Sequence, residues 1–552
     1  MLSTLSTLLL ILPLLAAGAI ALAPERLSKW IATFATLGVF AVSLAFAWGF
    51  PGWTDGSIAP ADAGIPIGLG IQLSLGADAV GVMLILLTTF LMPLAMIGSF
   101  TAVKERLKEY YGWFMLLEAA MLGVFLAKDA IVFYTAYEFT LVPMYFLIAI
   151  YGGADRRPAS IKFFLYTFFG SMLTLAGVIY IAAQNAMAAG EWTFDLARLA
   201  EFASSMSPER QFWVFILLMA GFAVKVPLFP WHTWLPLAHD QAPTAGSVIL
   251  AGTLLKLGTY GVYRIALPSA PIGGVELNQL LAVLCILGIV VTALICWVQH
   301  DVKKLVAYSS VSHLGFCMLG LFSLNSIGAT GSVMYMINHG LSTGALFLCI
   351  GMIYERYHTK DMDQLGGLFR RMPVWSFFMV FFTFASLGLP GLNGFIGEFL
   401  CLMGCFIAEP NSVAGYPGIL GPWYAVVAGS GLVLAAMYLL IMLGKLVWGP
   451  LKEPHGAEPH GHGHGHGHDH ADGLPTDLSA REIGILIPLA VVCLAIGLYP
   501  KPMLEAIAPS VEKTLAAYPK HVEKYVRDGS LVKPAESKDP TVALAQPADS
   551  IK

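Results

Sequence analysis

The stretch FAVKVPLFP at residues 222–230 decides the fold of this chain. Lys225 lies there inside an apolar run, and Pro227 and Pro230 follow it closely. Proline removes a backbone donor and clashes with the preceding turn, so the pattern predicts a helix that breaks beside a buried charge. A charge at the centre of a bilayer costs at least about 2.5 kcal/mol on insertion scales, which makes Lys225 a candidate functional residue.

The rest of the chain places this stretch in a membrane. Of its 552 residues, 57% are hydrophobic and 12% are charged, whereas a soluble domain carries about 25% charged residues. Apolar runs of roughly 20 residues, long enough to cross a bilayer as helices, recur from 2–22 to 482–502. We predict an all-α polytopic membrane protein with about fourteen transmembrane helices. The runs at 112–128 and 129–150 are the least certain pair, because two charged residues alone separate them.

Basic residues set the predicted orientation. Lys and Arg gather in the odd-numbered connections between the predicted helices, for example at Lys104, Arg156 and Arg370, and are sparse in the even-numbered ones. By the positive-inside rule the odd-numbered connections face the cytoplasm. Both termini are therefore expected on the outer, periplasmic side of a bacterial inner membrane.

Ionisable residues recur inside the apolar runs. They are Glu118, Glu138, Lys225, Lys256, His313, His339 and Glu398. Burial disfavours the charged form of such groups and a nearby opposite charge favours it, so a small movement of one partner can make the other release a proton. At 4 Å and an effective dielectric constant of about 20 the attraction is roughly 4 kcal/mol. The pattern predicts a proton relay; the alternative is that the charges only hold helices together.

A second punctuated helix suggests an internal repeat. Gly388, Pro390, Gly391 and Gly394 precede Glu398, so the twelfth predicted helix should be discontinuous like the seventh. The two breaks lie five helices apart, which predicts two inverted five-helix repeats, because an odd number of spans reverses the orientation.

These patterns divide the chain into six segments. We expect N-terminal helices with an outer loop, a first five-helix repeat, a second five-helix repeat, a His-rich cytoplasmic loop, a last transmembrane helix and a polar tail with one short helix. Their bounds are 1–110, 111–268, 269–450, 451–481, 482–502 and 503–552.

The sequence offers no cofactor site. The seven cysteines all fall in apolar helical sequence without a CxxC pair, and no haem, iron–sulfur, dinucleotide-binding or P-loop motif is present. We therefore expect no cofactor, no catalytic metal and no nucleic-acid partner. The alternating His and Gly residues at 460–470 could bind Zn²⁺ or Ni²⁺, but a polar spacer is the simpler interpretation.

Four weaker candidates lie at the ends of predicted helices. His232 and His239 are expected at the inner mouth between the seventh and eighth helices, where they could feed protons inward or lie among lipid headgroups. Lys303 and Lys304 are expected to be lipid-facing anchors rather than proton carriers.

Longer motifs resemble a known family. The stretches FAVKVPLFPWHTWLPLAHDQAPTAGSVILAGTLLKLGTYG at 222–261, QHDVKKLVAYSSVSHLG at 299–315 and NHGLSTGALF at 338–347 are similar to the antiporter-like membrane subunits of respiratory complex I. The resemblance covers roughly residues 75–450. Glu398 is an acid where the L-type and N-type subunits usually carry Lys, so the chain looks most like the M-type subunits.

The resemblance implies proton pumping driven by quinone reduction in other subunits of an NADH-quinone oxidoreductase. It assigns Glu138 and Lys225 as an ion pair, Lys256 as the central relay and Glu398 as the exit residue. Implied partners are the L-type and N-type subunits and, indirectly, a peripheral arm with FMN and iron–sulfur clusters.

The resemblance is incomplete in one loop. The family usually has Asp where Leu237 stands and Thr-Glu where Asp240 and Gln241 stand, so the role of acids there is open. The alternative function is that of a subunit of a multi-subunit cation/proton antiporter of the Mrp type.

Overall fold

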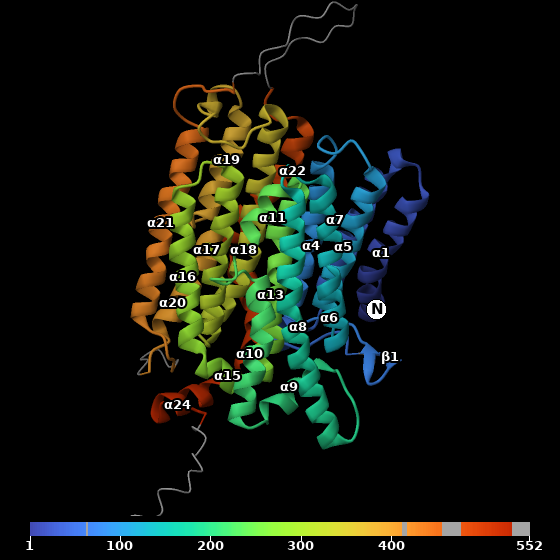
Figure 1. Cartoon of the computed structure of the whole chain (residues 1–552), viewed down its shortest axis with the longest axis vertical. Helices are drawn as coiled ribbons and strands as arrows, with labels where there is room; N and C mark the ends of the chain where they lie inside the picture. Colours follow the sequence, from blue (N-terminus) through green and yellow to red (C-terminus); the bar gives the residue numbers. More distant parts are fainter. Residues whose placement is uncertain (62–63, 411–416, 455–475, 533–552) are drawn as a thin grey trace, which may run out of the picture.

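The fold is a bundle of long helices that run along the long axis of the molecule (Figure 1). The computed structural model describes residues 1–61, 64–410, 417–454 and 476–532. Within these residues eleven helices are long and apolar enough to cross a membrane, by length and composition. The predicted all-helical membrane fold is confirmed, while the number of crossings stays a prediction.

The N-terminal part packs against one side of the bundle. Its elements are α1 (Leu2–Leu22), η1 (Glu25–Leu27), α2 (Ser28–Trp48), α3 (Gly52–Asp55), β1 (Ile65–Gly68), β2 (Ile71–Leu73) and α4 (Ala79–Gly98). The antiparallel hairpin β1–β2 pairs Ile65 with Leu73 and was not predicted. Gly68, Leu69 and Gly70 in its turn have positive φ angles. The strands were not predicted because they are very short and lie in a segment rich in Gly and Pro.

The next part begins the first predicted repeat. It contains α5 (Leu107–Leu126), α6 (Ala130–Phe139), α7 (Leu141–Tyr151), α8 (Arg156–Ala189) and α9 (Leu196–Ser204). The uncertain pair of runs is two helices, because Asp129 caps α6 by accepting a hydrogen bond from the Ile131 amide at 2.9 Å. An additional break separates α6 from α7 at Thr140, and Pro143 explains it because it cannot donate to the Phe139 carbonyl.

The seventh predicted helix is discontinuous, as expected. It consists of α10 (Pro208–Lys225) and α11 (Leu235–Gln241), separated by irregular chain at 226–234. The eighth is continuous but irregular, with α12 (Thr244–Ile249), η2 (Leu250–Leu254), α13 (Leu255–Gly261), η3 (Val262–Ala266) and α14 (Leu267–Ser269), followed by α15 (Pro271–Glu276). Both η2 and η3 are π-helical, so each widens the helix by one residue per turn next to Lys256.

The last part repeats the broken-helix pattern. It contains α16 (Asn278–Trp297), α17 (Val302–Phe322), α18 (Ser326–Tyr357), η4 (Leu368–Arg370), α19 (Pro373–Ser386), α20 (Asn393–Ile407), α21 (Pro422–Leu446) and α22 (Ala480–Leu498). The break at 387–392 lies where the glycines and Pro390 predicted it, and Gly388 and Gly391 adopt positive φ angles there.

Two helices follow α22 instead of the one predicted in the tail. These are α23 (Lys501–Leu515) and α24 (Tyr518–Asp528), and Pro519 lies in the first turn of α24, a position that favours a new helix start. In Figure 1 α24 lies at the same end of the bundle as β1, α9 and α15. The His-rich tract at 460–470 and residues 533–552 lie outside the described residues.

Burial identifies the centre of the bundle. The most apolar segment of α18 is wholly buried, and so is that of the helix at Thr244–Ser269. The corresponding segment of α17 is almost wholly buried, whereas the segments of α1 and α22 are about one third buried. Lys256, His313 and His339 are therefore carried by the three innermost helices.

Candidate functional site

Lys225 ends α10 at the point where the seventh helix breaks. Its side chain is 1% exposed, and its Nζ donates a hydrogen bond to Thr140 Oγ1 at 3.3 Å. The same ammonium lies 5.1 Å from the centre of the Tyr137 ring. The lysine thus contacts the break between α6 and α7 and is partly stabilised by a cation–π interaction.

Glu138 interacts electrostatically with Lys225, and Glu118 is a second buried acid in the first half of the chain. All four carboxylate oxygens are buried without a hydrogen-bond partner. Within the described ranges no ion pair joins Glu138 to Lys225 at 4.0 Å or less; Thr140, two residues beyond Glu138, contacts the lysine instead. The direct contact implied by the family resemblance is therefore not formed in this conformation.

Lys256 lies at the centre of the bundle, where the π-helical turn η2 leaves a carbonyl free. Its Nζ donates to Ala251 O, a residue of that turn, and contacts His339 Nδ1 at 2.8 Å. Because an ammonium is only a donor, His339 Nδ1 must accept, and the ring proton of neutral His339 then lies on Nε2. The eighth helix and α18 are thus joined by a lysine–histidine hydrogen bond.

His313, Tyr335 and Glu398 form a second connected group. The Tyr335 hydroxyl lies 2.5 Å from His313 Nδ1 and donates to Glu398 Oε1, and His313 Nδ1 is 3.4 Å from the same carboxylate oxygen. All three side chains are at most 4% exposed. With Tyr335 donating to the carboxylate, His313 donates from Nδ1, which leaves its Nε2 as the acceptor when neutral.

The two groups meet at their histidines. The rings of His313 and His339 have centroids 5.7 Å apart, and the Nε2 atom of each is buried without a hydrogen-bond partner. These contacts place five residues in one line through four helices, and four of the five were candidates from the sequence. The order is Lys256, His339, His313, Tyr335 and Glu398.

Tyr335 is the one member of this line that sequence reasoning missed. It carries no charge at neutral pH, so a search for buried charges passes over it. A signal was present, because Tyr335 precedes His339 by four residues and both therefore lie on one face of α18.

The break between α19 and α20 holds Glu398 in place. A Cβ atom at Gly388 would lie 2.3 Å from Glu398 Oε2, so any other residue there would displace the carboxylate. Asn338 and Asn393 clasp the break onto α18: each side-chain amide donates to the other residue's carbonyl, at 2.6 and 3.1 Å. This reciprocal pair fixes the start of α20 against α18.

The weaker candidates lie deeper than predicted. His232 and His239 are 6% and 0% exposed, so neither lies among lipid headgroups. Lys303 was expected to face lipid, and this is wrong: it is 8% exposed, and its Nζ donates to the Ala242 carbonyl at 2.5 Å. The free carbonyls at the end of α11 attract it inward.

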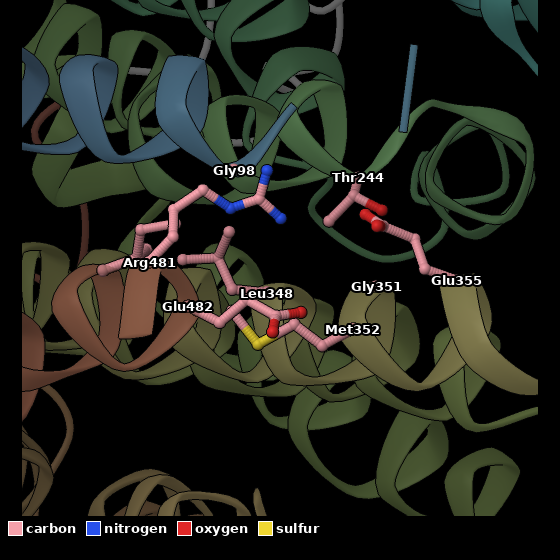
Figure 2. Close-up of a pocket in the computed structure, with 9 residues that line it drawn as sticks. Gly98, Thr244, Leu348, Gly351, Met352, Glu355, Arg481 and Glu482 are labelled. Atoms are coloured by element: carbon pink, nitrogen blue, oxygen red, sulfur yellow. The ribbon is translucent and has the colours of Figure 1, made fainter. Parts of the chain in front are cut away.

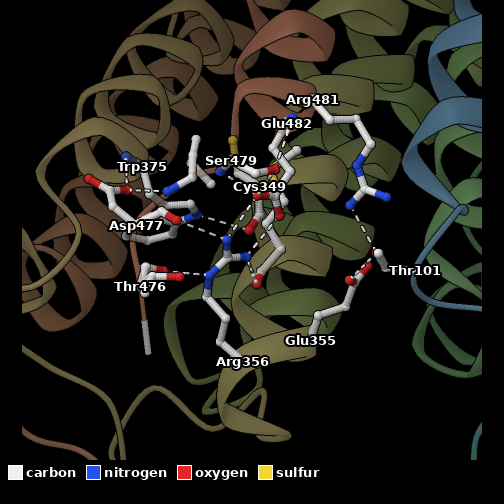
Figure 3. A network of polar contacts seen from close by, with 12 residues as sticks. Thr101, Cys349, Glu355, Arg356, Trp375, Thr476, Asp477, Ser479, Arg481 and Glu482 are labelled. Carbon is white, nitrogen blue, oxygen red and sulfur yellow. Dashed lines mark hydrogen bonds and ion pairs between the residues drawn. The ribbon is translucent and has the colours of Figure 1, made fainter. Parts of the chain in front are cut away.

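A separate polar network joins the end of α18 to the start of α22 (Figure 3). The end of the bundle at which Thr101, Arg356 and Arg481 lie is here called the basic end. Arg356 donates to both Glu482 oxygens at 2.8 Å and to the Asp477 carbonyl at 3.2 Å. A small cavity beside it is lined by Thr244, Glu355, Arg481 and Glu482 among others (Figure 2). These contacts fasten the start of α22 to α18 and do not reach the line from Lys256 to Glu398.

The described residues contain no group of three or more His, Cys, Asp and Glu side chains placed to hold a metal ion. All seven cysteines are free and buried, as their positions in apolar sequence predicted. The expected absence of a cofactor stays a prediction.

These features define a class: a multi-pass membrane protein with broken helices and a buried line of ionisable side chains. A family model described as NADH:quinone oxidoreductase/Mrp antiporter, transmembrane, matches residues 127–420. NADH-quinone oxidoreductase subunit M of Rhodobacter capsulatus is 39% identical over 533 residues, covering 92% of this chain and 95% of the relative. The chain belongs to this family, and the resemblance stated from its motifs is confirmed.

Solved structures share the fold. A chain of respiratory complex I from Thermus thermophilus matches with a TM-score of 0.79 and 28% identity, covering 93% of this chain and 99% of that one. A chain of the Mrp complex from a Dietzia species matches with a TM-score of 0.78 at 21% identity, covering 95% of this chain and 99% of that one. The second likeness shows the fold alone.

Proposed function

We propose that this chain is the proton-translocating M subunit of a respiratory NADH-quinone oxidoreductase. The proposal rests on the similarity to subunit M along nearly the whole chain and on one structural observation. That observation is the line of buried titratable side chains from Lys256 to Glu398, joined by hydrogen bonds except at the pair of histidines.

The protonation pattern of the line suits directional transfer. Lys256 donates to His339 Nδ1, His339 then carries its proton on Nε2, and His313 offers Nε2 as an acceptor while donating from Nδ1 towards Tyr335. A proton released by Lys256 can therefore enter at His339 and leave at Glu398 through successive exchanges. The histidine rings must approach each other, or a water molecule must join them, for the transfer to be completed.

The first half of the chain supplies a switch in this proposal. Among the described residues no carboxylate lies within 4.0 Å of Lys225 Nζ, and Glu138 lies two residues before Thr140, the hydrogen-bond partner of the lysine. Approach of Glu138 to about 4 Å would stabilise the charged lysine by roughly 4 kcal/mol. When Glu138 and Lys225 approach, the lysine would hold its proton, and when they separate it would release the proton. We assign Glu118 to the same half-channel.

The arrangement of broken helices supports the proposed repeats. α10–α11 and α19–α20 are each interrupted near a buried ionisable residue, Lys225 in one and Glu398 in the other. We assign residues 111–268 and 269–450 to two inverted repeats with one half-channel each. Residues 1–110 flank them, 451–481 form a cytoplasmic loop, 482–502 a last crossing and 503–552 an outer tail.

The redox chemistry is assigned to other subunits. We propose L-type and N-type antiporter-like subunits as membrane neighbours, and a peripheral arm with FMN and iron–sulfur clusters as the source of energy. The chain itself binds protons and lipid, holds no redox cofactor, and lies in a bacterial inner membrane with both termini outside.

Purification of the native assembly tests this proposal. The chain should co-purify with subunits that oxidise NADH and reduce quinone, and vesicles containing the assembly should pump protons when NADH is added. Co-purification with antiporter subunits alone, together with sodium-dependent proton exchange and no NADH oxidation, would instead identify an Mrp-type complex.

A further inference from the structure

We propose that Asp240 is a positioning residue that clamps α11, the detached half of the seventh helix, to α17 and to the loop after α18. The inference deepens the proposed function, because α11 links the break after Lys225 to the helix that carries Lys256. It concerns the acid that the family resemblance left without a role.

Asp240 is surrounded by cations although it is only 7% exposed. Its Oδ1 accepts a hydrogen bond from Lys360, and Lys304 Nζ lies 3.5 Å from its Oδ2. Gln241 donates to Oδ2 at 2.8 Å. Lys360 also lies 3.7 Å from Asp301, the residue that caps α17, so one carboxylate ties together three separate segments.

The backbone at the end of α11 is held by the same lysines. Lys303 donates to the Ala242 carbonyl at 2.5 Å and approaches the Asp240 carbonyl at 3.5 Å. Lys360 donates to the Asp240 carbonyl at 3.2 Å. Cations at these carbonyls complement the negative end of the helix.

Tertiary contacts such as this clamp are needed because α11 is too short to be stable as a helix by itself. It has seven residues, far fewer than the 12–15 or so that an isolated helix needs in water, and irregular chain precedes it. Its other anchors include the Trp234 Nε1 bond to the Val224 carbonyl at 2.9 Å, the Gln241 side chain, which accepts from the Asp155 amide, and the His239 carbonyl, which accepts from Ser247 Oγ at 3.1 Å.

The clamp fixes a buried histidine. His239 precedes Asp240 directly, is fully buried, and stacks on the Phe347 ring of α18 with centroids 4.7 Å apart. Neither ring nitrogen of His239 has a hydrogen-bond partner among the residues that the structure describes. The histidine interacts electrostatically with Lys303 and Lys256, so movement of α11 would change the surroundings of the central lysine.

Loss of the Asp240 charge should release α11. Asp240→Asn keeps the side-chain size but removes the acid beside the buried Lys303 and leaves the partly exposed Lys360 with Asp301 alone. A buried charge without a nearby acid is strongly unfavourable. Hydrogen exchange of residues 235–243 in the intact assembly should then accelerate roughly ten-fold or more. Protons pumped per quinone reduced should fall, while Asp240→Glu should restore both quantities.

Asp363→Asn is the matched control. Asp363 also pairs with a lysine and a histidine near the basic end, Lys445 at 2.7 Å and His300, but it does not contact α11. This variant should leave exchange at 235–243 and pumping unchanged. The clamp is wrong if Asp240→Asn exchanges like the unmodified chain, or if Asp363→Asn accelerates the same amides. Because exchange is measured without turnover, failure of the clamp is distinguishable from failure of the proposed proton pump.

Discussion

Tyr335 joins the two ends of the buried line, since its hydroxyl contacts both His313 and Glu398. Removing that hydroxyl with Tyr335→Phe should lower proton pumping roughly a hundred-fold, as loss of a proton-transferring group does. The measurement is the pumping rate of vesicles with equal amounts of assembled complex.

Tyr110→Phe is the control for this substitution. Tyr110 is equally buried and its hydroxyl lies 2.8 Å from Ser99 Oγ, far along the chain from the line. It should pump at the unmodified rate. Equal losses in both variants would mean that Tyr335 contributes stability and not proton transfer.

A pair of glycines tests the position of Glu398. Gly388 and Gly391 both have positive φ angles, so alanine at either should cost roughly 1–2 kcal/mol of backbone strain. A Cβ at Gly388 would lie 2.3 Å from Glu398 Oε2, whereas at Gly391 it would meet nothing within 4 Å. Gly388→Ala should therefore abolish most pumping, and Gly391→Ala should lower thermal stability alone.

At this scale the sequence predicted charges better than contacts. Apolar surroundings make a buried Lys, Glu or His stand out, so seven candidate residues were found without a structure. The hydroxyl of Tyr335 and the room beside Gly388 depend on how helices meet, which no single stretch of sequence encodes. The same limit explains Lys303, whose buried position depends on the carbonyls of α11.

Among the elements, the helix breaks are the part most visible in sequence. Pro227, Pro230 and Pro390 mark two of them, because proline cannot continue the backbone hydrogen-bond ladder. The break at Thr140 was not predicted, because the continuous apolar run at 129–150 indicated a single helix in spite of Pro143. The π-helical turns around Lys256 carry no comparable sequence signal, since their residues also suit an α-helix.

Helix contact at the first break yields an element-scale prediction. A Cβ at Gly258 would lie 2.8 Å from Val226 Cγ2 and 2.9 Å from the Val226 amide nitrogen, so α13 packs directly on the chain after Lys225. Gly258→Leu should force these segments apart and reduce both thermal stability and pumping. Gly112→Leu in α5, where no atom lies within 4 Å of an added Cβ, should change neither.

For the whole molecule, the proposed orientation places the basic end in the cytoplasm. The seven native cysteines are all buried, so single cysteines introduced at exposed sites give a clear labelling signal. A membrane-impermeant thiol reagent added outside intact cells should label cysteine at Lys501 and spare cysteine at Lys104. The opposite pattern would invert the topology.

The most direct test of the account compares Lys225→Ala and Lys256→Ala with Lys501→Ala, a lysine exposed outside the bundle, in NADH-driven proton pumping. We expect the first two variants to assemble but to lose most pumping, whereas Lys501→Ala should pump normally. Normal pumping by both variants would contradict the claim that Lys225 and the line that begins at Lys256 carry protons.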